Sequence, residues 1–97
     1  MNTYISLVNY TDLGIKTIKD VPERIERSRA RAKELGGEIK QIFLTMGAYD
    51  LVVISEFPDA EAMAKFALIT AGPGNLRTTT LQAFPEDQFR SIVESLP

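Results

Sequence analysis

Apolar and polar residues alternate along four short stretches of the chain, and these stretches are rich in β-branched and aromatic residues. Such alternation is typical of strands that cover a core with one face. It predicts strands at residues 3–10, 38–46, 50–57 and 76–84. Between the second and third strands lie only Gly47, Ala48 and Tyr49, the length of a hairpin loop.

Two longer stretches place apolar or small residues three and four positions apart, which indicates one face of an α-helix. The first of these faces consists of Val21, Ile25, Ser28, Ala32 and Leu35, and the second of Ala60, Met63, Phe66, Ala67 and Thr70. Asp20 and Glu23 match a capping box at the start of the first helix, and Asp59 is an N-cap residue for the second. A last short helix follows Pro85, with its apolar side chains on one face: Phe89, Ile92, Val93 and Leu96.

The order of elements is therefore β-α-β-β-α-β with a terminal helix, in a single domain over residues 1–97. This order is that of the ferredoxin-like α+β sandwich, with a four-stranded antiparallel sheet. Right-handed crossovers would place both long helices on the same face of that sheet.

The two faces of the predicted sheet differ in composition. One set of alternating positions is wholly apolar, and we expect it to contact the helices: Ile5, Leu7, Ile42, Leu44, Val52, Ile54, Leu81 and Ala83. The opposite set mixes hydroxyl and amide side chains with Tyr4, Phe43, Leu51 and Val53. Left open, these four would form an exposed apolar patch. A second copy packed face to face, forming a dimeric barrel with a ligand cavity inside, would cover it. The alternative is a monomer with a mixed open face.

The composition of the chain excludes several kinds of reactive and metal-binding site. The chain has no cysteine and no histidine, which excludes disulfides, thiolate nucleophiles, Cys/His zinc sites and a Ser-His-Asp triad. We expect no metal and no tightly bound cofactor. The apolar runs are too short to cross a membrane, and the start lacks a signal-peptide pattern, so we expect a cytoplasmic protein.

Charge is unevenly distributed along the chain. Residues 1–48 hold eight Lys/Arg against six Asp/Glu, whereas residues 49–97 hold three against seven. The basic residues gather in RIERSRARAK (24–33), but the helix also carries Glu23, Glu26 and Glu34, and no aromatic side chain is interspersed as a stacking surface would need. This pattern favours a solvated helix face over a nucleic-acid site.

Tyr49 and Asp50 follow the hairpin glycine and are the candidates for catalysis. In the structural interpretation, Gly47 supplies a positive φ and Asp50 binds backbone amides of the turn. In the functional interpretation, Asp50 accepts a proton or anchors a polar ligand group, and Tyr49 donates a hydrogen bond.

A second group of candidates would bind a ligand. Arg77 precedes a run of threonines, and a cation beside hydroxyl groups suits a carboxylate or phosphate. The alternative is that the threonines serve strand formation and that Arg77 pairs with a surface acid. The complete set of ligand-binding candidates is Arg77, Thr78, Thr80, Ser6, Gln41 and Phe43.

Three segments together resemble the GYD-domain family of small bacterial and archaeal proteins: YISLVNYTDLGIKTIKD, GGEIKQIFLTMGAYDLVVISEFPD and GNLRTTTLQAF. The literal Gly-Tyr-Asp signature is absent, because Ala48 separates Gly47 from Tyr49 and Asp50. The resemblance implies a dimeric α+β barrel, an architecture that other families use for cofactor-independent oxygenation, lactone isomerisation and haem chemistry. It implies no particular reaction.

Two functions follow from these observations. The first is binding, with or without transformation, of a small organic ligand in the cavity of a homodimeric barrel. The alternative is a non-catalytic module that builds a homo-oligomer. The sequence leaves open whether the protein is an enzyme.

Overall fold

The computed structural model describes all residues, 1–97. The elements in chain order are β1 (Asn2–Tyr10), α1 (Asp12–Lys16), the 3-10 helix η1 (Ile18–Asp20), α2 (Val21–Glu34), β2 (Glu38–Leu44), β3 (Leu51–Phe57), α3 (Ala60–Ala71), β4 (Leu76–Ala83) and α4 (Glu86–Glu94). The predicted strands and helices are all present, with ends that agree to within two residues.

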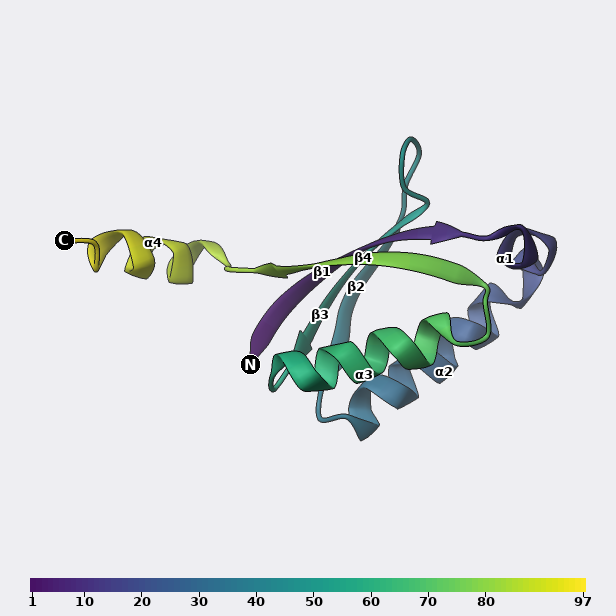
Figure 1. The fold of residues 1–97 in the computed structure, drawn as a ribbon, viewed down its shortest axis with the longest axis horizontal. Helices are drawn as coiled ribbons and strands as arrows, with labels where there is room; N and C mark the ends of the chain where they lie inside the picture. Colours follow the sequence, from purple (N-terminus) through teal and green to yellow (C-terminus); the bar gives the residue numbers. More distant parts are fainter.

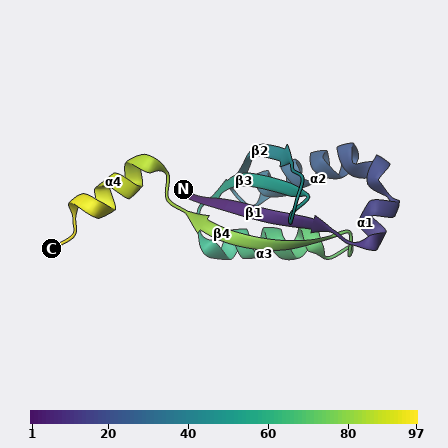
Figure 2. The same cartoon turned by 90° about the horizontal axis from the view of Figure 1, so that it is seen from above.

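The four strands form one antiparallel sheet in the order β2-β3-β1-β4. Helices α2 and α3 lie side by side on one face of the sheet, and α4 projects beyond the end of β4, away from everything else (Figures 1 and 2). The predicted ferredoxin-like α+β fold is therefore confirmed. None of the helices is long and apolar enough to span a membrane.

Side-chain caps fix the start of two helices. The Asp59 carboxylate accepts a hydrogen bond from the backbone N–H of Ala62 at 2.8 Å and caps α3. Thr11 caps α1 in the same way, through the N–H of Gly14. The predicted capping box at Asp20 is wrong, because η1 leads directly into α2. Asp20 already has helical backbone angles (φ −85°, ψ −2°), and its side chain makes no capping hydrogen bond.

The core is built around Phe57, which is completely buried at the end of β3. Its ring lies 5.1 Å from that of Phe66 on α3 and 6.4 Å from that of Tyr4 on β1, centroid to centroid. Gly37 leaves room for this ring, since a Cβ at that position would overlap Phe57. The aromatic cluster therefore joins the sheet to α3.

The expected assignment of the two sheet faces is wrong for three of the four strands. The helices cover the mixed face: Tyr4, Ser6, Val8 and Ser55 are buried there, and Leu51, Val53, Thr78 and Thr80 line the space beneath α2 and α3. The apolar positions of β1, β3 and β4 point to the open side. Both faces carry enough apolar residues to form a core, so alternation alone does not determine which face the helices cover.

A β-bulge at Lys40 explains why β2 behaves differently. Ile39 pairs with Ser55 and Gln41 pairs with Ile54, so Lys40 is the extra residue. The bulge lets Ile39 and Ile42 both face the helices and leaves Gln41 and Phe43 on the open side, as expected for these two residues.

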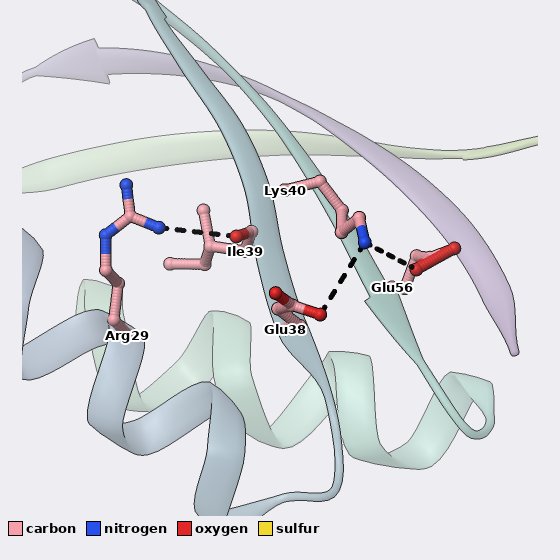
Figure 3. A network of polar contacts seen from close by, with 5 residues as sticks. All are labelled: Arg29, Glu38, Ile39, Lys40 and Glu56. Atoms are coloured by element: carbon pink, nitrogen blue, oxygen red, sulfur yellow. Dashed lines mark hydrogen bonds and ion pairs between the residues drawn. The ribbon is translucent and has the colours of Figure 1, made fainter.

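Polar contacts hold the bulge in place (Figure 3). Lys40 Nζ lies 3.6 Å from a carboxylate oxygen of Glu38 and 3.6 Å from one of Glu56. Arg29 of α2 donates a hydrogen bond of 3.3 Å to the Ile39 carbonyl. The bulge is therefore tied both to the neighbouring strand and to a helix.

The open face of the sheet is strongly apolar. Strand pairing places residues in rows across it, and the two central rows are Phe43–Val52–Leu7–Thr79 and Gln41–Ile54–Ile5–Leu81. Phe43 is 48% exposed and Leu81 is 49% exposed. Leu44 pairs with Leu51 on the helix side, as expected, but it lies at the end of β2 and is 81% exposed.

Candidate ligand site between the sheet and the helices

A cavity of about 90 Å³ lies between the mixed face of the sheet and helices α2 and α3. Twelve of its eighteen lining residues are hydrophobic, so its interior is mainly apolar. Ile42 and Val53 of the sheet face Met63, Phe66 and Ala67 of α3 across this space. An apolar cavity with a few polar groups is the usual form of a small-molecule site.

Small hydroxyl side chains explain why this space is not filled. Ser6, Thr78 and Thr80 of the sheet and Ser28 and Thr70 of the helices stand where larger apolar residues would close the core. The Ser6 and Thr80 hydroxyl oxygens lie 3.4 Å apart and form a hydrogen bond. Thr70 donates to the Phe66 carbonyl at 3.0 Å. The hydroxyl groups of Ser6, Thr80 and Thr70 therefore have partners while the volume stays open.

Tyr10 and Arg24 provide the other polar groups of the lining. Arg24 Nη1 donates to the Thr17 hydroxyl at 2.8 Å, whereas Arg24 Nη2 is buried and no protein group accepts a hydrogen bond from it. Burial raises the pKa of the Tyr10 hydroxyl above its ordinary value; the nearby Arg24 guanidinium lowers it, and Asp50 raises it. Tyr10 is therefore a neutral hydrogen-bonding group at neutral pH.

An outer groove of about 370 Å³ runs beside α2 and the loop after α3. Arg24, Arg27 and Arg31 line it at helical spacing, and only Arg31 has an acidic partner, Glu34 at 3.1 Å. Ser28 and Thr70 belong to the lining of both the groove and the cavity. The groove is therefore basic, and it adjoins the cavity.

The structure separates the predicted ligand-binding residues into two groups. Ser6, Thr78 and Thr80 line the cavity together. Gln41, Phe43 and Arg77 lie on the opposite, open face, where Arg77 pairs with Asn9 across the strands. The six residues thus do not form one site: Gln41 and Phe43, expected on the same face as Ser6, Thr78 and Thr80, lie on the opposite face, as does Arg77.

Tyr49 and Asp50 lie in the hairpin and do not line the cavity. The Asp50 carboxylate accepts a hydrogen bond from the Tyr10 backbone N–H at 2.9 Å. The Tyr49 carbonyl accepts one from the Thr45 hydroxyl at 2.6 Å. Gly47 has φ +118°, the positive value that was predicted for it. These contacts favour the structural interpretation of the hairpin.

Sequence reasoning missed Arg24 and Tyr10. Arg24 was grouped with the solvated basic face of its helix, although it lies one residue before Ile25 and four before Ser28, both on the buried face. That spacing is the signal that could have found it, since residues three and four apart share a face. The lining of the cavity contains no acidic residue, and nowhere in the structure do three acidic side chains gather as metal ligands would.

Comparison with known proteins identifies the family. The sequence model of the GYD domain matches residues 4–93. The chain belongs to the GYD domain family. This GYD protein is 35% identical over 86 residues to the "Glutamine synthetase and cystathionine beta-lyase binding protein" of Thermus thermophilus, covering 88% of this chain and 90% of the relative.

Solved structures share the fold at lower identity. A feast or famine regulatory protein from M. tuberculosis, complexed with L-methionine, superposes with a TM-score of 0.65 at 15% identity over 87% of this chain. The GYD chain spans only 50% of that protein's length. The protein FFRP-DM1 superposes with a TM-score of 0.61 at 17% identity, covering 87% of this chain and all of its own. These similarities support the ferredoxin-like fold.

Proposed function

We propose that this GYD protein is a binding protein that holds a small organic molecule in the cavity between its sheet and helices α2 and α3. The observation that carries the proposal is the cavity of about 90 Å³, which small hydroxyl residues keep open inside a mainly apolar lining. About 10–15 Å³ of such volume holds one water, so this space has room for a molecule larger than water.

The lining favours binding over catalysis. It contains no carboxylate, and the chain has no histidine or cysteine, so no side chain with a pKa near neutrality stands in the cavity as a general base. Tyr10 stays protonated, because burial raises its pKa. The available groups donate hydrogen bonds and exclude water, which is what recognition of a ligand requires.

A neutral probe tests the cavity itself. Addition of 1-butanol should shift the NMR signals of the Ile42, Val53 and Met63 methyl groups. Thr78→Leu places a larger side chain in the cavity and should abolish these shifts, whereas Thr79→Leu, on the open face, should preserve them. Wild-type protein whose cavity methyl signals do not respond to the probe would contradict the proposal.

We further propose that the protein acts as a homodimer that buries the open face of the sheet. Exposed Phe43 and Leu81, with the apolar rows between them, form an exposed apolar patch, and its contact with water is energetically unfavourable. Helix α4 adds exposed Phe89 and Leu96 at the end of an arm that its own chain leaves uncovered. Each copy of the chain carries the open face of the sheet and the exposed apolar residues of α4. Two chains related by a two-fold axis can therefore bury both surfaces symmetrically.

The same surface favours a second candidate function, which is binding of another protein. The Thermus thermophilus relative is named for binding two enzymes. In this chain, the exposed apolar residues of the open face and of α4 would serve such contacts. Mixing with purified glutamine synthetase or cystathionine beta-lyase, followed by size-exclusion chromatography, tests this candidate directly.

A further inference from the structure

We infer that the ligand is a short-chain organic anion, with its apolar tail in the cavity and its anionic group between Arg24 and Arg27 in the outer groove. This inference rests on the proposed function and adds to it the chemical class of the ligand. Three features of the two hollows support it: their adjacency, their charge and their size.

The cavity and the groove adjoin each other. Arg24, Ser28, Thr70 and Leu76 line both of them, so these four residues lie at the boundary between the two. The inner side of this boundary is mainly apolar, whereas only two of the nine residues of the groove are hydrophobic. A molecule that occupies both therefore needs an apolar end and a polar end.

The charge of the groove selects an anion. Arg24, Arg27 and Arg31 stand at positions i, i+3 and i+7 of α2, on one face of the helix. Arg24 Nη2 is buried without an acceptor, and Arg27 has no ion pair. A buried guanidinium N–H without a partner is costly, and a carboxylate or phosphate oxygen would satisfy it in a charge-assisted hydrogen bond.

The absence of acidic residues from both linings disfavours an amino acid as the ligand. The ammonium group of a zwitterion would enter a site that already holds three arginines and has no carboxylate to receive it. Its charge would be repelled at short range, where partial burial weakens screening by salt. A simple anion avoids this repulsion.

The size of the cavity limits the tail. About 10–15 Å³ of such volume holds one water-sized group, so about 90 Å³ admits roughly six to nine such groups. A propyl or butyl tail therefore fits inside the cavity. Butyrate and butyl phosphate are suitable probes, with 1-butanol as the neutral match, acetate as the truncated match and 2-aminobutyrate as the zwitterionic match.

NMR titration of the cavity methyl groups tests the inference. Butyrate or butyl phosphate should bind at least about tenfold more tightly than 1-butanol, as expected for a charge-assisted hydrogen bond in a partly buried site. The tighter of the two anions identifies the group that the arginines prefer. Acetate and 2-aminobutyrate should bind more weakly than butyrate. Butanol binding as tight as that of both anions would overturn the inference and leave the proposed cavity function intact.

Charge-neutralising variants separate the roles of individual residues. Arg24→Gln and Arg27→Gln should each weaken anion binding about tenfold and leave 1-butanol binding unchanged. Lys33→Gln removes one positive charge from an exposed position of the same helix outside the groove and should have no such effect. Equal weakening by all three variants would show a general charge effect and would overturn the assignment. Circular dichroism verifies that each variant is folded.

Discussion

The carboxylate of Asp50 accepts a hydrogen bond of 2.9 Å from the backbone N–H of Tyr10. The N–H of Asp50 also donates to the Val8 carbonyl at 2.8 Å, so Asp50 is tied to the end of β1 at two points. The Tyr10 side chain lines the cavity. Asp50 therefore acts on the site indirectly, by holding the strand that carries Tyr10.

Substitution of Asp50 tests this structural role. Asp50→Asn keeps an acceptor oxygen and should lower the free energy of unfolding only slightly. Asp50→Ala leaves the Tyr10 N–H without that partner and should cost about 1–3 kcal/mol in urea denaturation. Asp20→Ala is the matched control, because the Asp20 side chain makes no capping hydrogen bond. Equal stability of Asp50→Ala and wild type would refute the anchoring role.

Gly47 is required for the hairpin turn. Its φ of +118° lies in a region that side chains with a Cβ rarely adopt. Gly47→Val should destabilise the protein by about 1–3 kcal/mol through backbone strain, although open space surrounds the position. Ala48→Val, one residue further, should change the denaturation midpoint little. A wild-type midpoint for Gly47→Val would show that the turn tolerates a side chain.

Phe66 packs on Phe57 at the centre of the core. Phe66→Ala should lower the free energy of unfolding by about 3–5 kcal/mol, through lost burial and the enlarged cavity. Leu68, on the same helix, is 74% exposed, and Leu68→Ala should stay within about 0.5 kcal/mol of wild type. Similar losses for the two variants would mean that α3 presents a different face to the sheet.

Stability should fall at alkaline pH because of Tyr10. Its pKa is raised in the folded protein, chiefly by burial, so the folded state holds the phenol proton more tightly than the unfolded state. The resulting stability is fully present below the unfolded pKa of about 10 and is lost as pH rises through the folded pKa. Unfolding experiments from pH 8 upward should show a smaller alkaline loss for Tyr10→Phe than for wild type. An identical pH profile for the two proteins would contradict this.

The proposed dimer is tested at Phe43. Phe43 lies in a central row of the open face, so Phe43→Lys would place a charge in the buried interface and should dissociate the pair. Sedimentation at micromolar concentration should show two chains for wild type and one for the variant. Leu68→Lys, on the exposed side of α3, should remain dimeric. A wild-type protein that sediments as a monomer would refute the dimer.

Much of the fold follows from the sequence by itself. Alternation and helical spacing indicated every strand and the helices α2, α3 and α4, and short-range signals placed some local features: Asp59 caps α3, and Gly47 takes the positive φ of its turn. These features depend on neighbours within a few residues, which is the distance over which a sequence pattern carries information.

The candidate site could not be predicted in the same way. Ser6, Thr78 and Thr80 were identified as ligand-binding candidates, but the same set included Gln41, Phe43 and Arg77, which lie on the other face of the sheet. Arg24 was assigned to solvent, yet its side chain enters the boundary between the cavity and the groove. Both errors concern which face of the sheet, and which side of α2, is buried. Burial depends on contacts between segments that are distant in the sequence.

Only the tertiary structure decided which face of the sheet the helices cover. Both faces are apolar enough to form a core, so the difference lies in packing: the Phe57 ring occupies the space beside Gly37 and meets Phe66, which turns the mixed face inward. The bulge at Lys40 then shifts the alternation of β2 alone. The hydroxyl residues therefore line the cavity, and the apolar rows face outward. Alternation can be read from a single strand, whereas burial depends on which segments pack against that strand.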